Sequence, residues 1–228
     1  MKKIKISLFP FLAVAIIHLT GMFIDSRTVE MITKPLLVGS LLFYFLIETK
    51  GQRPNIRLWM VLAMAFCILG DTLLMFNRGD EFFFVSGLAA FLTGHIFYIF
   101  AFRIIQKKNQ VGFHPLRSLV VLAYMVVILW LLLPAVNELK VPVVLYAVVI
   151  SMMLIFAVQL TKIGKFGWMI AIGALLFVIS DSAIAINKFY TPIPKNRWIV
   201  MFTYIVAQYF IVSGVVGYIQ STSKNSEL

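Results

Sequence analysis

Two aspartates lie inside long apolar runs of this chain, and their type and placement make them the first candidates for chemistry. Asp71 lies within Leu69–Met75 (LGDTLLM), and Asp181 lies within Ile179–Ala185 (ISDSAIA). Of the nine acidic residues, only these two lie well inside hydrophobic segments. A charged aspartate at membrane depth costs about 2.5–3.5 kcal/mol on insertion scales, so such residues usually face a bundle interior or a watery cavity. Paired carboxyl groups in that setting can do acid–base chemistry or relay protons.

His95 is a third titratable residue in an apolar run, and it shares a helix face with small and aromatic residues. Gly87, Phe91, Gly94 and Tyr98 recur around it at helical spacing. A face of this kind favours helix contact together with a cavity. His95 is as readily a packing residue as a catalytic one, and the sequence leaves both interpretations open.

Further polar residues accompany the second aspartate and the last apolar run. Ser180 directly precedes Asp181, and Tyr204 and Gln208 lie one helical turn apart on one face. Gln208 is either an interhelical hydrogen-bonding residue or a contact to the substrate. We expect Ser180, Tyr204 and Gln208 to position substrate or water.

Two lysines lie near helix ends, where a lipid headgroup would lie. Lys188 follows Asp181 by seven residues, so it shares the face of Asp181 about 10 Å further along the helix. Lys34 precedes Pro35 at the start of an apolar run. Each lysine either snorkels to the interface or attracts an anionic headgroup. Lys34 and Lys188 are therefore the candidate headgroup-binding residues.

Composition defines the class of protein that holds these residues. Hydrophobic residues make up 61% of the 228 residues, and they form runs of about 17–24 residues, which is long enough to cross a bilayer. We predict an all-α fold, a polytopic membrane bundle of eight transmembrane helices in a single domain over 1–220, followed by a short polar tail over 221–228. The predicted helices are 6–24, 31–48, 58–76, 82–105, 116–134, 141–160, 167–188 and 197–219.

The distribution of charge predicts the orientation of the bundle. The chain carries 20 Lys and Arg against 9 Asp and Glu, a net charge of +11. Of these 20 basic residues, 13 fall on the side that holds both termini and 7 on the other, so the positive-inside rule predicts that both termini are cytoplasmic. Basic residues flank the apolar runs instead of forming arginine-rich clusters, so no nucleic-acid partner is expected. The single cysteine, Cys67, excludes an intrachain disulfide.

In this orientation the three titratable residues are expected to meet. Asp71 lies 13 residues after Leu58 and Asp181 lies 14 residues after Gly167, or about 20 and 21 Å into their helices. His95 lies about 20 Å from the outer end of its own helix. We predict that the two aspartates lie at similar depth in the outer third and share a cavity whose floor is His95.

Taken together, several stretches resemble the YhhN-like family, whose members include lysoplasmalogenases. The resemblance spans roughly residues 30 to 215 and includes the number of helices. It is carried by Lys34-Pro35, Leu69–Met75, Phe91–Tyr98 (FLTGHIFY), Phe177–Ser182 with Asn187–Phe189, and the segment from Tyr204 through Gln208 to Gly214.

The resemblance implies an intramembrane hydrolase that cleaves the vinyl ether bond of lysoplasmalogens, giving a fatty aldehyde and glycerophosphoethanolamine or glycerophosphocholine. The two membrane-embedded aspartates proposed to be catalytic in the family correspond to Asp71 and Asp181. Burial beside a second carboxylate favours the protonated form of one group, which can protonate the vinyl ether, while its ionised partner stabilises the cation and deprotonates water. We expect His95 and Tyr98 to position water or the substrate oxygen.

Two other functions stay open at this point. The aspartates could serve as a proton relay in a transporter or lipid-binding protein, or they could bind a metal with His95 in a metal-dependent lipid hydrolase. Aldehyde release separates hydrolysis from transport, and sensitivity to chelators separates the two hydrolases. We expect no cofactor and no metal, a lysophospholipid-like substrate among membrane lipids, and a multi-pass location in the bacterial cytoplasmic membrane.

Overall fold

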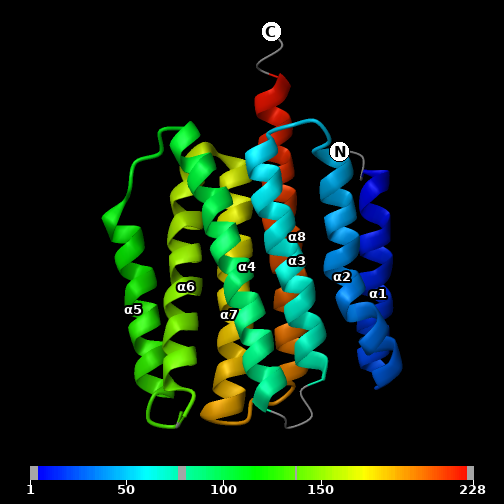
Figure 1. Cartoon of the computed structure of the whole chain (residues 1–228), viewed down its shortest axis with the longest axis vertical. Coiled ribbons are helices and arrows are strands. Elements are labelled where there is room, and N and C mark those ends of the chain that lie inside the picture. The colour runs from blue at the N-terminus through cyan, green and yellow to red at the C-terminus, as the bar shows by residue number, and fades with distance from the viewer. Residues whose placement is uncertain (1–4, 77–80, 137, 225–228) are drawn as a thin grey trace. The chain divides into compact units, whose positions relative to one another are not determined.

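The computed structural model describes residues 5–76, 81–136 and 138–224, and these residues form helices joined by short connections (Figure 1). Within the described ranges, eight helices are long and apolar enough to cross a membrane, which confirms the predicted all-α, multi-pass architecture. The helices are α1 Phe9–Phe23, α2 Arg27–Glu48, α3 Pro54–Met75, α4 Glu81–Lys108, α5 Pro115–Leu132, α6 Lys140–Gln159, α7 Lys165–Phe189 and α8 Asn196–Lys224. Two short 3-10 helices accompany them: η1 Ile6–Leu8 directly precedes α1, and η2 Leu160–Ile163 directly follows α6.

The helices differ from the predicted ones mainly at their ends. α2 begins at Arg27 and α3 begins at Pro54, each four residues before the predicted start. Proline suits the first turn of α3, because the N–H that it lacks would have no helical partner there. Pro35 lies in the ninth position of α2, inside the helix, where it removes one backbone hydrogen bond. α8 runs on to Lys224, so residues 221–224 of the predicted polar tail continue the helix.

The chain divides into two compact units. Unit 1 comprises Met1–Phe97 and Ile219–Leu228, and unit 2 comprises Tyr98–Tyr218. Unit 1 therefore holds α1, α2, α3, the first part of α4 and the end of α8, whereas unit 2 holds the rest of α4 with α5, α6, α7 and most of α8. The division into one transmembrane domain over 1–220 and a tail over 221–228 stays a prediction.

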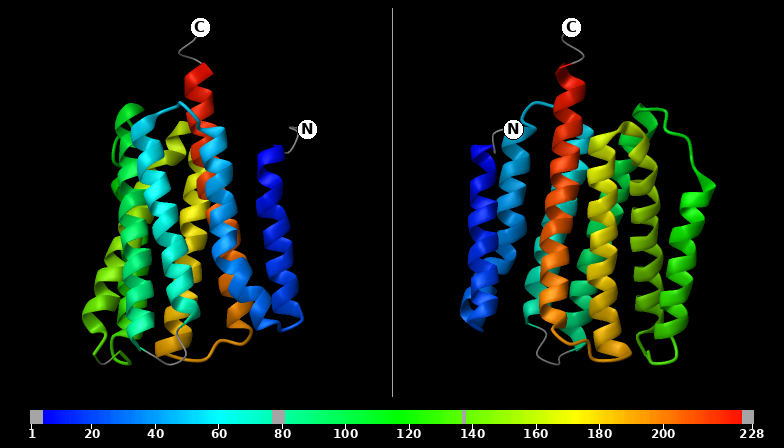
Figure 2. Two further views of the ribbon diagram at one scale, coloured as in Figure 1. Left: turned by 45° about the vertical axis from the view of Figure 1, so that its right-hand side comes forward. Right: turned by 180° about the vertical axis from the view of Figure 1, so that it is seen from behind.

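Unit 1 is built from helices that follow one another in the chain and pack as neighbours. α1 packs against α2 and α2 packs against α3, and Figure 2 shows these helices side by side. α3 and α4 approach closely at two glycines. A methyl group added at Gly70 would lie 2.5 Å from the ring of Phe91, and one added at Gly94 would lie 3.1 Å from the carbonyl oxygen of Ala63. Small residues at these positions let the two backbones come together.

Unit 2 repeats this kind of packing. α5 packs against α6 and α6 packs against α7, in chain order. α7 and α8 approach closely where Gly173 faces the backbone of Ala207 and Gly214 faces the backbone of Phe166. A methyl group added at either glycine would lie within 3 Å of a carbonyl oxygen of the other helix. The α7–α8 contact therefore depends on glycine as the α3–α4 contact does.

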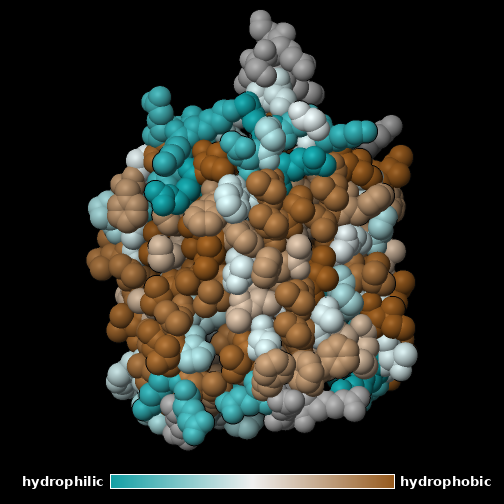
Figure 3. Space-filling view, in the orientation of Figure 1, coloured by the Kyte–Doolittle hydropathy of each residue, from teal (hydrophilic) through white to brown (hydrophobic). Residues whose placement is uncertain are grey.

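The outer faces of the helices are apolar. Large hydrophobic side chains remain exposed along them, such as Trp130 (76%), Phe202 (62%) and Leu119 (61%). In Figure 3, hydrophobic side chains cover the middle parts of the helices, and hydrophilic side chains gather at the helix ends. Exposed apolar surface on this scale is unfavourable in water but matches the hydrocarbon of a bilayer.

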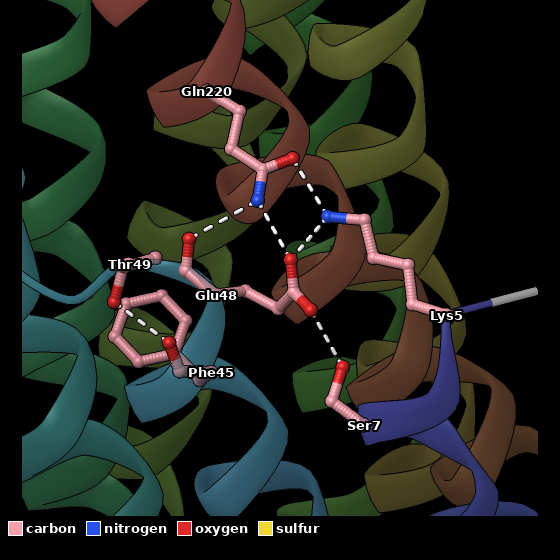
Figure 4. Close-up of polar contacts among 6 residues, drawn as sticks. All are labelled: Lys5, Ser7, Phe45, Glu48, Thr49 and Gln220. Carbon is pink, nitrogen blue, oxygen red and sulfur yellow. Dashed lines mark hydrogen bonds and ion pairs between the residues drawn. The ribbon is translucent and has the colours of Figure 1, made fainter.

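A polar cluster joins three helix ends in unit 1 (Figure 4). Glu48, the last residue of α2, accepts hydrogen bonds from Ser7 (2.6 Å), from Gln220 of α8 (2.8 Å) and from Lys5, which also donates to Gln220 (2.7 Å). The start and the end of the described chain therefore lie at one end of unit 1. That this end is cytoplasmic stays a prediction. Three of the basic residues counted for the orientation lie outside the described residues: Lys2, Lys3 and Arg78.

The glycine contacts give a test of the fold. We expect Gly173→Ala to lower the free energy of unfolding by about 1–3 kcal/mol, the usual cost of overpacking, because the added methyl group would lie 2.8 Å from backbone atoms of Ala207 and Ile211. Gly39→Ala is the matched control, since nothing lies within 4 Å of that position in α2, and alanine favours a helix. SDS-induced unfolding of both purified variants measures the difference. Equal stability of the two variants would contradict the close contact.

Candidate functional site

Asp71 is buried in unit 1 and faces a cation. Its side chain is 2% exposed, and its Oδ1 lies 3.9 Å from Nζ of Lys34, whose side chain is 22% exposed. α2 and α3 are neighbours that run in opposite directions, so the eighth residue of α2 and a residue four positions before the end of α3 come together. The structure thus pairs a residue predicted to be catalytic with one predicted to bind a headgroup.

Asp71 lies further from the start of its helix than the sequence predicted. The predicted start of the helix at Leu58 put it 13 residues in, whereas α3 begins at Pro54 and ends at Met75, so Asp71 is 17 residues in and about 6 Å from the end. Likewise α2 begins at Arg27, which moves Lys34 from the predicted helix edge to a depth of about 10 Å. The pair therefore lies inside the helices but near one end of each.

Packing around Asp71 connects it to His95. Phe91 of α4 lies against Gly70, the residue before Asp71, and the imidazole of His95 stacks on the ring of Phe91 with centroids 6.5 Å apart. His95 is fully buried and lies 14 residues after Glu81, near the middle of α4. Unit 1 thus holds Lys34 beside Asp71, and Phe91 contacts both His95 and the neighbour of Asp71, Gly70.

Asp181 has different partners in unit 2. The phenol of Tyr146 on α6 donates a hydrogen bond to Oδ2 of Asp181, and Asp181 itself is partly exposed. On the next residue along, the hydroxyl of Ser182 accepts a hydrogen bond of 2.9 Å from Tyr124 on α5. Two tyrosines from neighbouring helices therefore hold the segment that carries Asp181.

The predicted positioning residues of unit 2 form contacts between α7, α8 and α4. The hydroxyl of Ser180 donates to the carbonyl of Val200 (3.1 Å), and the ring of Tyr204 meets Phe177 edge-on with centroids 5.3 Å apart. The phenol of Tyr98 donates to Oε1 of Gln208 (2.8 Å), whose amide in turn donates to the Tyr204 phenol (3.4 Å). Buried polar groups in a membrane span need such partners.

Lys188, the second candidate headgroup-binding residue, is exposed near the end of α7. Its ammonium lies 5.7 Å from the ring centroid of the adjacent Phe189. This placement fits a lysine that snorkels along the helix toward the interface. It contrasts with Lys34, whose charge is directed at a carboxylate.

Sequence reasoning missed the pairing of Lys34 with Asp71 and the role of Tyr146. Both pairs connect consecutive helices. Lys34 lies seven residues after the start of α2 and Asp71 four before the end of α3, while Tyr146 lies six residues after the start of α6 and Asp181 eight before the end of α7. Accurate helix bounds would have indicated both. Asp71 and His95 belong to unit 1 and Asp181 belongs to unit 2, so the predicted shared cavity and equal depth stay predictions.

The described part of the chain brings no three His, Cys, Asp or Glu side chains together as a metal site requires. The metal-dependent alternative needs Asp71 and His95 of unit 1 together with Asp181 of unit 2, and it stays an open alternative. The chemistry that the arrangement supports is that of single carboxyl groups, one beside an ammonium and one beside a phenol.

Fold and site together define a multi-pass α-helical membrane protein that carries two aspartates within its spans. The YhhN family model matches residues 29–215, and the chain belongs to the YhhN family.

The chain is similar to proteins named lysoplasmalogenase. It is 34% identical to TMEM86B of Sus scrofa over 149 residues and 33% identical to TMEM86B of Homo sapiens over 156 residues, in each case 65% of this chain and 59% of the relative. It is 32% identical to TMEM86A of Homo sapiens over 163 residues, 68% of this chain and 63% of the relative. The chain thus spans about three fifths of the length of these relatives. No solved structure matches the chain.

The hydrogen bond to Asp181 gives a test of the site. If the Asp181 carboxyl group is ionised, we expect Tyr146→Phe to lower the free energy of unfolding by about 1.5–3 kcal/mol, the range for a hydrogen bond to a charged group. Tyr124→Phe is the matched control, since it removes a neutral hydrogen bond to Ser182 in the same region and is expected to cost only about 0.5–1.5 kcal/mol. SDS-induced unfolding compares the two. A larger loss for Tyr124→Phe would show that Tyr146 does not hold Asp181.

Proposed function

We propose that this chain is an intramembrane hydrolase that cleaves the vinyl ether bond of lysoplasmalogen-like lysophospholipids, releasing a fatty aldehyde and a glycerophospho-headgroup. The observation that carries the proposal is the charge pair of Lys34 with the buried Asp71 inside spanning helices. Removing such charges from water is costly, and ionisable residues in membrane spans are functional by default. The names of the relatives support the choice of substrate.

The proposed reaction needs a proton donor, a proton acceptor and one water molecule. A carboxylic acid protonates the carbon of the double bond that is not bonded to oxygen. This gives an oxocarbenium ion, which an ionised carboxylate stabilises. Water then adds to the cation and gives its proton to a carboxylate. The hemiacetal breaks into the aldehyde and the glycerol hydroxyl, so one water is consumed overall. We assign these proton transfers to Asp71 and Asp181 jointly.

The other candidate residues have supporting roles in this proposal. His95 lies in unit 1 with Asp71, whereas Ser180 adjoins Asp181 in unit 2, and both are buried. The buried hydrogen bonds among Tyr98, Gln208 and Tyr204 fix the orientation of polar groups that position water or the substrate oxygen. Lys34 and Lys188 are the proposed contacts to the headgroup phosphate.

The carboxylates give the direct test of the proposal. We expect purified wild-type protein in detergent to release fatty aldehyde from a lysoplasmalogen, and Asp71→Asn and Asp181→Asn each to lower the rate by about 10²–10⁴-fold, the usual contribution of general acid–base catalysis. A lysolipid with a saturated ether in place of the vinyl ether should give no aldehyde, because it cannot form the oxocarbenium ion by protonation.

Asp25→Asn is the matched control for these variants. Asp25 is an exposed aspartate with a φ of 55°, a conformation that asparagine tolerates well. The turnover of Asp25→Asn should therefore equal that of the wild type. Rapid turnover by both Asp71→Asn and Asp181→Asn would sink the proposal. A chelator in the assay tests the metal-dependent alternative, and absence of aldehyde from well-folded wild type would shift the weight to transport or lipid binding.

We propose further that both termini are cytoplasmic and that the protein resides in a bacterial cytoplasmic membrane. The excess of basic residues on the side of the termini supports this orientation. A green fluorescent protein fused to the C-terminus should fluoresce, because it folds in the cytoplasm, and an alkaline phosphatase fused there should be inactive. The opposite pattern would reverse the orientation.

A further inference from the structure

The geometry of Lys34 leaves it able to serve a second anion. Its Nζ lies 3.9 Å from Asp71 Oδ1, beyond the 2.7–2.9 Å of a charge-assisted hydrogen bond. An ammonium has three donors on a flexible four-carbon stem. Its side chain is 22% exposed while that of Asp71 is 2% exposed. One side of the ammonium therefore faces a buried carboxylate, and the other remains accessible.

The position of Lys34 in α2 puts a lipid phosphate within its range. Lys34 follows the first residue of α2, Arg27, by seven positions, or about 10 Å along the helix axis. A lysine at that depth reaches toward the interface by extending its stem. Phosphates of membrane lipids lie in the headgroup layer at that interface.

We infer that Lys34 is a specificity-determining residue that changes partners: it pairs with Asp71 when the site is empty and moves to the substrate phosphate when a lysophospholipid binds. This inference rests on the proposed function. The exchange releases Asp71 to act on the vinyl ether only when a phosphate is present. Headgroup recognition and exposure of the catalytic carboxyl group are then one event, within unit 1.

The long contact between Lys34 and Asp71 permits such an exchange. The attraction between two charges falls as their separation grows, so a phosphate oxygen at hydrogen-bonding distance competes well with a carboxylate at 3.9 Å. The phosphate also brings several acceptor oxygens, whereas the contact to Asp71 is a single long one.

A substrate without phosphate separates this mechanism from simple binding. The probes are an alkenyl-glycerophosphocholine and the matching alkenyl-glycerol, which carries the same vinyl ether but no phosphate. On wild-type protein we expect kcat/KM to favour the phospholipid by about 10- to 100-fold, the range expected for a charged hydrogen bond. Part of this preference should lie in kcat, because the alkenyl-glycerol leaves Lys34 on Asp71.

Variants of Lys34 test the residue. We expect Lys34→Met to lose most of the preference, with a lower rate on the phospholipid and an equal or higher rate on the alkenyl-glycerol. Lys34→Arg should retain most of it, because arginine also binds phosphate. Lys50→Met is the matched control, since Lys50 is an exposed lysine just beyond the other end of α2, and it should leave both substrates unchanged.

The outcomes separate this inference from the proposed function. If Lys34→Met slows both substrates equally, or Lys50→Met reproduces its effect, the partner exchange is wrong while the hydrolase stands. If wild type releases no aldehyde from either substrate, the hydrolase and this inference fall together. If Lys34→Met does not fold, the wild-type protein is used for the test. Methyl phosphate added to the alkenyl-glycerol assay should then raise kcat, because it occupies Lys34. No effect, or inhibition, would overturn the exchange.

Discussion

The absence of water in the hydrocarbon of a bilayer is the constraint on which the rest of this structure depends. A polar side chain within a span must find its partner in the protein. Asp71 meets Lys34, Asp181 meets Tyr146, and Gln208 meets Tyr98. Each contact joins two helices, and glycines such as Gly70 and Gly173 let adjacent helices approach closely.

The two aspartates and their partners occupy similar positions in the first four and the last four helices. Asp71 is the eighteenth residue of α3 and its partner is the eighth residue of α2, while Asp181 is the seventeenth residue of α7 and its partner is the seventh residue of α6. In both cases the aspartate lies on the third helix of a group of four and its partner lies on the second. The two aspartates therefore occupy similar positions in their helices, and each contacts the helix that precedes its own in the chain.

Much of this arrangement was predictable, and the part that was not has a physical reason. Runs of apolar residues identify the eight helices because a span must be long and apolar, and Asp71 and Asp181 stand out because charge is rare there. The partners were harder to find. Helix ends depend on capping and on proline, and α2 begins at Arg27, four residues before the predicted start. That error of one turn made Lys34 look like an interfacial anchor. Tyr146 carries no charge, so nothing in its own type distinguished it from a packing residue.

The partners differ in one respect that bears on mechanism. A phosphate can attract the ammonium of Lys34 away from the carboxylate of Asp71. The phenol of Tyr146, which contacts Asp181, is neutral and is not attracted in this way. On the proposed function, the pair of Lys34 and Asp71 can therefore exchange its ammonium for a contact to the headgroup, whereas the hydrogen bond from Tyr146 to Asp181 offers no such exchange. A lysophospholipid carries a single phosphate, so one responsive carboxylate is sufficient.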